Sequence, residues 1–293
     1  MEKAFEINGL KLKFPDFNLG PIDLNLEQGT VLAYIGPNGS GKTTTMQCMV
    51  GLLKHDSGKI KIFGKENNPN KPDWKYNIGY VGDKHVFYEN WSGKKNLEFV
   101  SQFYPDWDYN FAADFVKRFD IPLQKKASKL STGNRAKLSL INALAHKPKL
   151  LILDEPTSGL DPVVRDEFLD VLFEAVENQG SAVFYSTHIL SDISRIADEL
   201  AFLNNGKIML RTAKDDLTEK WRTISFKLNK NGVEFNEAVH TEKDGLNYKI
   251  ISKNYETTLQ QLHQLGAENI SEVRMSVDEI SVQILRNRKL AGE

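Results

Sequence analysis

The chain has 293 residues, of which 40% are hydrophobic and 26% charged, a composition typical of a folded globular protein rather than a disordered or fibrous one. Its 38 basic and 39 acidic residues leave a formal charge of −1, which excludes a bulk attraction to nucleic acid or anionic lipid. The length suits one large domain and a smaller one.

A single cysteine, Cys48, cannot form an internal disulfide, and the start MEKAFEING lacks the apolar run of a secretory signal. No apolar stretch approaches the roughly 18–20 residues that a membrane-spanning helix needs. We therefore expect a cytoplasmic protein, and if it acts at a membrane, another chain supplies the membrane-spanning part.

Apolar runs alternate with helical patterns from residue 1 to about 220, which predicts an α/β domain over 1–220 with a largely parallel sheet. The runs are VLAYI (31–35), KIKIF (59–63), NIGYV (77–81), LLILD (150–154) and AVFYS (182–186). The last two runs do not alternate, as expected of central parallel strands that are covered on both faces.

A helical insert is expected at about 84–145. Within it, aromatic residues recur every four positions on either side of Pro105, which predicts two helices. After Trp221 the pattern changes. Apolar residues alternate at 224–228, 248–250 and 280–284 and follow helical spacing at 259–265, which predicts a small α+β domain over 223–293.

The segment GPNGSGKTT (36–44) follows a predicted strand, precedes a predicted helix and satisfies G-x-x-x-x-G-K-[ST]. Glycines allow the backbone to turn and direct N–H groups at phosphate oxygens, and the helix N-terminus adds a positive dipole end. Lys42 is expected to reach the β- and γ-phosphates, and Thr43 to bind Mg²⁺. The expected nucleotide-binding residues are Gly36, Pro37, Asn38, Gly39, Ser40, Gly41, Lys42, Thr43 and Thr44. The structural alternative is a glycine-rich turn that opens a helix.

The run LLILDEP places Asp154 and Glu155 at the carboxyl end of a buried strand, where ligands of open α/β sheets bind. Asp154 is expected to hold Mg²⁺, and Glu155 to polarise the attacking water. His188 ends the next strand and is a candidate for the γ-phosphate region. The alternatives are an acidic turn and a structural histidine.

Together these motifs resemble an ATP-binding cassette (ABC) ATPase over residues 1–220. GPNGSGKTT is similar to the family's Walker A loop, LLILDEP to its Walker B strand, SGLD (158–161) to its D-loop and His188 to its switch histidine. The resemblance implies a P-loop NTPase fold with an N-terminal antiparallel β subdomain. It also implies ATP hydrolysis with Glu155, His188 and Lys42 as catalytic groups.

LSTGN (130–134) stands where the family has LSGGQ, which contacts the γ-phosphate held by the opposite subunit. The resemblance therefore implies a second cassette, identical or different. The implied trans contacts to ATP are Ser131, Thr132, Gly133, Asn134 and Asp161. The Ser131 hydroxyl, the Gly133 N–H and the helix dipole can each address an anion. The alternative is a surface helix that Ser131 merely caps.

Two departures and one aromatic assignment follow from the same resemblance. Thr132 and Asn134 replace a glycine and a glutamine of the family's signature. Asp83, in IGYVGD, stands at the position of the Q-loop glutamine; its carboxylate can bind Mg²⁺ but cannot donate a hydrogen bond when ionised. Phe14 is the best match for the adenine-stacking aromatic, with Phe17 as the second choice and a core position as the alternative.

FYPDWD (103–108) and the additional C-terminal domain are similar to cassettes of bacterial export systems of the Ytr and Bcr groups, which dock beneath a separate membrane permease. This implies outward transport, a peripheral position on the inner face of the cell membrane and no nucleic-acid partner. Trp91, Tyr104 and Trp107 then either line a groove for a permease helix or pack the insert's own core. A soluble ABC ATPase that acts on ribosomes or DNA, and a regulatory cassette with little turnover, are the competing functions.

Overall fold

The computed structural model describes residues 2–68, 70–230 and 232–287, and its contacts divide the chain into two units, Met1–Met209 and Leu210–Glu293. The division falls before the predicted boundary at 220–223, because α7 (Lys214–Lys220) packs on α9 (Val277–Arg286) of the second unit. Residues 288–293 of the predicted C-terminal domain lie outside the described residues. No helix in the described ranges is long and apolar enough to span a bilayer.

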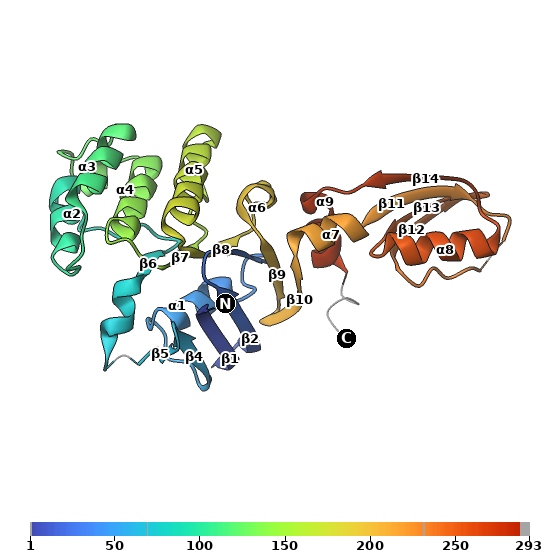
Figure 1. Cartoon of the computed structure of the whole chain (residues 1–293), viewed down its shortest axis with the longest axis horizontal. Coiled ribbons are helices and arrows are strands. Elements are labelled where there is room, and N and C mark those ends of the chain that lie inside the picture. The colour runs from blue at the N-terminus through green and yellow to red at the C-terminus, as the bar shows by residue number, and fades with distance from the viewer. Residues whose placement is uncertain (1, 69, 231, 288–293) are drawn as a thin grey trace. The chain divides into compact units, whose positions relative to one another are not determined.

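A six-stranded sheet with the order β10-β9-β3-β8-β7-β6 forms the centre of the first unit (Figure 1), although the edge strand β10 continues past Met209. Its strands are β3 (Val31–Ile35), β6 (Ile78–Val81), β7 (Leu150–Asp154), β8 (Ala182–Thr187), β9 (Glu199–Asn204) and β10 (Lys207–Ala213). Strands β9, β3, β8, β7 and β6 pair in parallel. Strands β3, β7 and β8 are buried along their whole length, as the lack of alternation in their sequences predicts.

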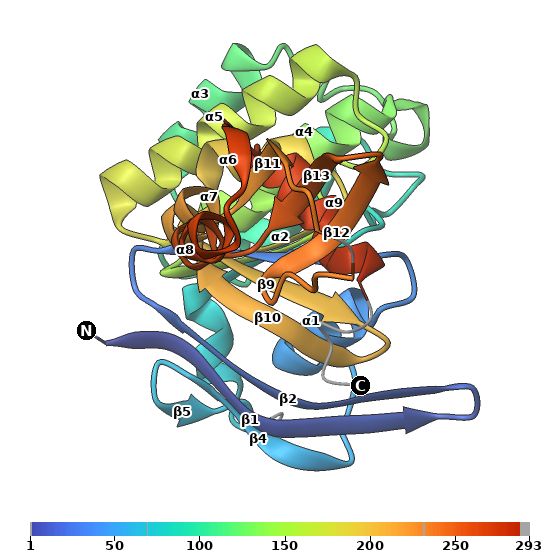
Figure 2. The same ribbon diagram turned by 90° about the vertical axis from the view of Figure 1, so that its right-hand side faces the viewer.

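A second sheet of the first unit is antiparallel and has the order β2-β1-β4-β5 (Figure 2). Its strands are β1 (Lys3–Phe14), β2 (Phe17–Glu27), β4 (Ser57–Ile62) and β5 (Lys65–Glu66). The run KIKIF thus contributes to this sheet and not to the parallel one. The reason is its alternation, since Ile60 and Ile62 are buried while Lys59 is exposed and only one face of an antiparallel sheet needs to be covered.

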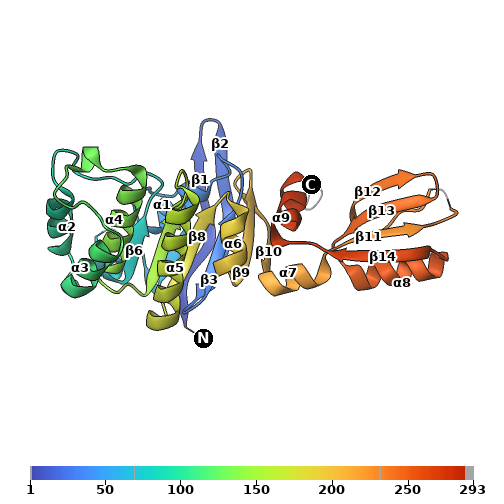
Figure 3. The ribbon, with the colours of Figure 1, turned by 90° about the horizontal axis from the view of Figure 1, so that it is seen from above.

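The helical insert gathers beside β6, at one edge of the central sheet (Figure 3). Its α-helices are α2 (Gly93–Ser101), α3 (Tyr109–Arg118) and α4 (Thr132–Leu144), and a 3₁₀ turn, Ala127–Lys129, precedes α4. Pro105 lies between α2 and α3, as predicted. Trp107 is buried and Tyr104 stacks on His146 with ring centroids 3.9 Å apart, so these two aromatics pack the core of the insert.

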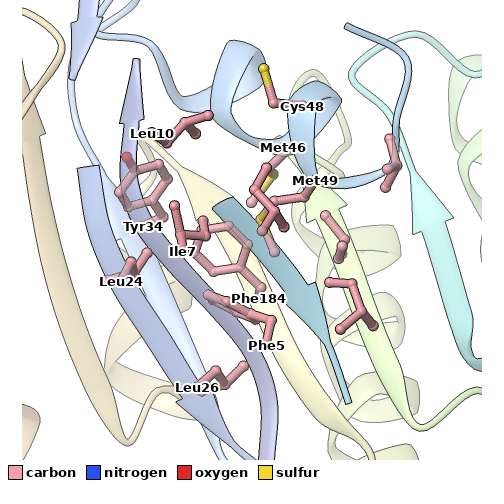
Figure 4. Close-up of a cluster of buried hydrophobic side chains, with 14 of the residues drawn as sticks. Phe5, Ile7, Leu10, Leu24, Leu26, Tyr34, Met46, Cys48, Met49 and Phe184 are labelled. Carbon is pink, nitrogen blue, oxygen red and sulfur yellow. The ribbon is translucent and has the colours of Figure 1, made fainter. Parts of the chain in front are cut away.

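The other helices of the first unit are α1 (Lys42–Met49), the 3₁₀ helix Pro72–Asn77, α5 (Pro162–Gln179) and α6 (Leu190–Ile196). One hydrophobic core joins α1 to both sheets (Figure 4). Phe184 of β8 contacts Phe5 of β1 and Tyr34 of β3, with ring centroids 5.0 and 5.1 Å apart. Met46 and Met49 of α1 are fully buried in the same core. The loop between β3 and α1 is therefore anchored at both ends.

The second unit is a four-stranded antiparallel sheet, ordered β12-β13-β11-β14, with α8 packed along it (Figure 3). Its strands are β11 (Arg222–Lys227), β12 (Ala238–Asp244), β13 (Asn247–Ser252) and β14 (Glu268–Arg274). Helix α8 (Tyr255–Leu265) inserts Leu262 among Ile224, Phe226 and Ile250 of the sheet.

The prediction of extended structure at 280–284 is wrong, because this segment belongs to helix α9. Val277, Ile280, Ser281 and Ile284 are the buried residues of α9, and they follow helical i, i+3, i+4, i+7 spacing. Ser276 and Glu279 form a capping box at its start. The alternation at 280, 282 and 284 indicates a strand only if Val277 and the capping residue Ser276 are not considered. With them, the pattern is that of a helix.

Candidate functional site

A cleft of about 800 Å³ opens at the carboxyl ends of the central strands. It brings together segments that lie far apart in the sequence: the β1–β2 turn, the loop after β3, the segment after β6 and the ends of β7 and β8. Its lining residues are Phe14, Asp16, Phe17, Asn38, Gly39, Ser40, Gly41, Lys42, Thr43, Thr44, Asp83, Glu155, Ser158 and His188. Most of the residues predicted for the nucleotide site thus surround one cavity.

Two glycines of the phosphate loop are required by its packing. A Cβ atom on Gly36 would lie 2.3 Å from the Leu203 carbonyl oxygen, and one on Gly41 would lie 2.7 Å from Leu19 Cδ1. Gly41 also has φ 109° at the N-cap of α1, a conformation that residues with a Cβ rarely adopt. The motif's fixed glycines therefore allow the loop to fold tightly against the sheet. Gly36 is buried, and it and the exposed Pro37 are outside the cleft lining.

Lys42, the first residue of α1, is almost fully buried beneath the loop. Its Nζ donates to the carbonyl oxygens of Gly36, at 2.7 Å, and Pro37, at 3.2 Å. The same atom lies 3.1 Å from Glu155 Oε1. A mobile lysine on the surface would lose most of its charge effect to solvent, whereas this ammonium group is held at the floor of the cleft.

Asp154 ends β7 and is fully buried. Its Oδ1 accepts a hydrogen bond of 2.7 Å from the Ser186 hydroxyl. Burial raises the pKa of Asp154, because it penalises the charged form, while the Ser186 and Thr43 hydroxyls oppose this shift. A positive ion in the cleft would act as the hydroxyls do, because it would stabilise the ionised carboxylate and lower its pKa.

Glu155 adopts a left-handed backbone conformation, with φ 49°. Its N–H donates to the hydroxyl and the carbonyl oxygen of Ser186, at 3.0 and 3.2 Å. Its side chain then spans two partners, Lys42 on Oε1 and His188 Nδ1, 2.5 Å from Oε2. The structure therefore brings the three predicted catalytic groups into one chain of contacts.

Oxygen atoms at and next to the cleft suit Mg²⁺, which is usually held by one or two carboxylates and by substrate phosphates. The fully buried Asp154 is not itself among the lining residues of the cleft. Asp154 Oδ2 is buried and has no hydrogen-bond partner. Thr43 adjoins Asp154, and Asp83 lines the cleft. Within the described ranges no group of three or more His, Cys, Asp or Glu side chains could hold a metal. The arrangement fits an ion that shares its ligands with a bound triphosphate.

Phe14 and Phe17 flank the β1–β2 turn and both line the cleft. Phe17 packs on the core and lies against Gly41, whereas Phe14 is 41% exposed. Because Phe17 is already engaged by the fold, Phe14 has the freer ring face and remains the better candidate for stacking on a purine.

Phe14→Ala is expected to weaken ATP binding about tenfold, because a stacked base contributes about 1–3 kcal/mol. Little effect on protein stability is expected, since the side chain is half exposed. Titration of the parent and the variant with ATP and with free inorganic triphosphate would measure the change in affinity. Weaker binding of ATP but not of triphosphate supports base stacking, and equal losses for both ligands would contradict it.

The LSTGN residues lie elsewhere. Ser131 caps α4, and its Oγ accepts from the Asn134 N–H at 3.3 Å. Asp161 caps α5 in the same way. Thr132 is exposed and Gly133 partly exposed, facing Val164 of α5. None of these predicted trans residues lines the cleft that holds Lys42 and Glu155.

Several residues near the site had not been predicted. Asp16 lines the cleft, and so does Ser158, which belongs to the SGLD motif but was not predicted as a site residue. Arg135 follows LSTGN directly, binds both carboxylate oxygens of Glu89 at 2.9 and 2.7 Å, and donates to the His85 carbonyl. It thus links the start of α4 to the segment after Asp83. In the sequence, its position directly after LSTGN was the one indication that Arg135 lies near the site.

A buried network supports the loop between Glu155 and α5. Thr157 Oγ1 and the Tyr185 hydroxyl both donate to Asp192 Oδ2, at 2.7 and 2.8 Å. All three side chains are almost fully buried. The network joins the loop to β8 and α6, and sequence analysis had no means to detect it because its members are 28 or more residues from Thr157 along the chain.

Comparison with known proteins agrees with this geometry. A family model described as ABC transporter matches residues 19–158. The ABC transporter ATP-binding protein YtrB of Bacillus subtilis (strain 168) is 32% identical over 70% of this chain and 70% of its own. The chain belongs to the ABC transporter ATP-binding family. It is an ABC ATPase, and ATP is its nucleotide.

Two further similarities extend over other parts of this ABC ATPase. The bacitracin transport ATP-binding protein BcrA of Enterococcus faecalis is 28% identical and covers 98% of this chain and 90% of its own, so the alignment includes the second unit. A solved ATP-binding subunit of an ABC transporter is 26% identical, with a TM-score of 0.66 over 74% of this chain and 92% of its own. The predicted P-loop NTPase fold is confirmed.

Proposed function

We propose that this ABC ATPase is the energy-supplying subunit of a bacterial exporter, and that two cassettes close around ATP during its cycle. The observation that carries the proposal is the separation of its motifs. Lys42 and Glu155 share one cleft, while Ser131 lies outside it. A second chain that contributes its own Ser131 would complete the site.

In the proposed reaction, water attacks the γ-phosphorus atom in line with the leaving ADP. Glu155 accepts a hydrogen bond from this water and orients it, and His188, on the other side of the carboxylate, fixes the carboxylate's position. Lys42 offsets the charge that develops on the phosphoryl oxygens. Glu155 contacts both Lys42 and His188. Lys42 Nζ also donates to two carbonyl oxygens of the phosphate loop, so it would exchange one of its three contacts for a phosphate oxygen when ATP binds.

The same proposal assigns Mg²⁺ to Thr43, Asp154 and Asp83. When bound, the ion would neutralise charge on the phosphates. Asp154 supplies a buried carboxylate oxygen without another partner, and Thr43 supplies a hydroxyl at the first turn of α1. Asp83 differs from the family's glutamine in being able to accept but not to donate hydrogen bonds when ionised.

The permease is proposed to dock on a second cleft of about 430 Å³, which adjoins the first. It is lined by residues from α1 and the segment after it, from β6 and the segment after it, and from α4. Asp83 belongs to both clefts. Val86 is 83% exposed and Leu52 63% exposed on its rim, which gives the apolar surface that a partner helix needs. This surface, and not the buried Trp107, is the proposed docking site.

Outward transport is proposed from the similarity to BcrA, which is named for bacitracin transport. The protein would then be peripheral on the inner face of the cell membrane. A soluble role on ribosomes or DNA is the competing proposal, and the net charge of −1 gives it no support. A cassette with little turnover would be favoured only if Asp83 proved to impair hydrolysis.

Co-expression with a candidate multi-span membrane subunit tests the proposal. The unmodified chain is expected to purify with that subunit in detergent and to hydrolyse ATP faster in its presence. Val86→Asp is expected to reduce the bound fraction more than about tenfold, because it places a charge in an apolar contact. ATP binding by the free chain should not change.

Val273→Asp is the matched control, because Val273 is 66% exposed on β14 of the second unit. It is expected to leave the complex intact. Equal loss of the complex in both variants would contradict the docking surface. Co-sedimentation with ribosomes in place of the membrane subunit would favour the competing role.

A further inference from the structure

We propose that the Ser186 hydroxyl is a positioning residue of the ATPase site, which orients Asp154 toward the metal and joins it to the backbone of Glu155. Ser186 is fully buried near the end of β8, directly opposite Asp154 in the parallel register of β7 and β8. The inference rests on the proposed Mg²⁺ role of Asp154 and does not depend on transport or on a second cassette.

The direction of each hydrogen bond at this hydroxyl is fixed. An ionised carboxylate only accepts and a backbone N–H only donates. The hydroxyl must therefore donate to Asp154 Oδ1, at 2.7 Å, and accept from the Glu155 N–H, at 3.0 Å. One donor and one acceptor are satisfied at the same time, so the hydroxyl has a single favourable orientation.

This orientation determines which oxygen of Asp154 is left for another ligand. Oδ1 is occupied by Ser186, while Oδ2 is buried and has no hydrogen-bond partner. Without the Ser186 hydroxyl, the weaker interaction with the Thr43 hydroxyl would be the remaining restraint on the carboxylate, which could then rotate more freely. Partners that orient metal ligands in this way typically alter metal affinity or activity by about 10–100-fold when removed.

The contact with Glu155 is shared. The Ser186 carbonyl accepts the same N–H at 3.2 Å, and an alanine would keep this contact. The left-handed backbone of Glu155 should therefore survive loss of the hydroxyl. Loss of the hydroxyl is expected to disturb the orientation of Asp154 more than that of Glu155. Mg²⁺ affinity and kcat should therefore decrease, while ATP binding without Mg²⁺ should not.

A buried serine can also serve stability alone, and Ser181 provides the comparison. Ser181 is equally buried, immediately precedes the same strand, and donates a hydrogen bond of 2.7 Å to the Pro148 carbonyl. It lies at the amino end of β8, away from the cleft lining. Ser181→Ala therefore removes one buried hydrogen bond without touching the site.

The test measures ATP binding by the full chain in EDTA, then titrates the ATP complex with Mg²⁺, and finally determines kcat. Ser186→Ala is expected to leave the Kd for ATP in EDTA within about twofold, to raise the Kd for Mg²⁺ about tenfold or more and to lower kcat about tenfold or more. Ser181→Ala, with a similar decrease in Tm, is expected to change none of the three by more than about twofold.

A Mg²⁺ affinity of Ser186→Ala within about threefold of the parent would overturn the inference, and so would equal losses in Ser181→Ala. Asp154→Asn separates this outcome from failure of the proposed Mg²⁺ site. If Asp154→Asn also leaves Mg²⁺ binding unchanged, the metal assignment itself is wrong. Should Ser186→Ala not fold, Ser186→Cys replaces it, because the thiol fills the space but is a weak donor and acceptor.

Discussion

Glu155→Gln is expected to lower kcat about 10²–10⁴-fold, the usual contribution of a positioned general base. Glutamine keeps the size of the side chain, but its amide has lost the charge that attracts the water's proton. ATP binding should persist, because the phosphate loop and the buried Lys42 are unchanged. Steady-state phosphate release and equilibrium binding of ATP would measure the two effects separately.

The same variant reports on assembly. If hydrolysis normally separates two cassettes, a chain that binds ATP without hydrolysing it should accumulate as a dimer at saturating Mg²⁺ and ATP. Light scattering would detect this change in mass. Glu174→Gln is the matched control, since Glu174 is a half-exposed carboxylate that pairs with Arg118 at 2.8 Å, away from the cleft. Persistent monomers would count against the closed dimer, and unaltered hydrolysis would exclude Glu155 as the base.

The sequence was most informative where a function depends on neighbouring residues. GPNGSGKTT was recognisable because its glycines, lysine and threonine stand at fixed spacing between a strand and a helix. The atoms that require Gly36 and Gly41 to be glycines belong to Leu203 and Leu19, and only the structure shows them. The position of Asp154 and Glu155 at the carboxyl end of a strand was predictable, because the apolar run before them marks where that strand ends. The parallel strands place the phosphate loop and these two carboxylates at the same edge of the sheet, as the general geometry of α/β sheets predicts.

The residues that sequence analysis missed depend on contacts between distant segments. Ser186 becomes relevant only through the register that sets it opposite Asp154, and a one-residue shift would turn its hydroxyl to the other face. Thr157, in the loop after β7, and Asp192, in α6, also meet only in the folded chain. The error at 280–284 is different, since Ile280 and Ile284 fit both a strand and a helix until the capping box at Ser276 is considered.

Asp83 links the chemistry to the proposed partner surface. It lines the nucleotide cleft together with Lys42 and Glu155, and it also lines the cleft that exposes Val86. Arg135, at the start of α4, holds the segment after Asp83 through its hydrogen bonds to His85 and Glu89. A movement of this segment would therefore reach both the phosphate end of the nucleotide and the residues of LSTGN.

Mixing two inactive variants gives the second large expected effect. Lys42→Ala removes the buried charge of the phosphate loop, and Ser131→Arg places a bulky cation at the exposed cap of α4. Each variant alone is expected to lose more than about 10²-fold in kcat, as other losses of phosphate-stabilising groups do. If Ser131 acts on the partner's nucleotide, an equal mixture should recover activity, because a mixed dimer contains one intact site.

Random pairing places half of the chains in mixed dimers, so the recovered rate should be about a quarter of the parent's if the sites act independently. A mixture of Lys42→Ala with Glu155→Gln is the decisive control. Lys42 and Glu155 share one cleft within a chain, so every site of that mixed dimer is damaged, and no recovery is expected. Recovery in both mixtures would contradict the division of the site between chains, and recovery in neither would show that Ser131 does not act on the partner's nucleotide.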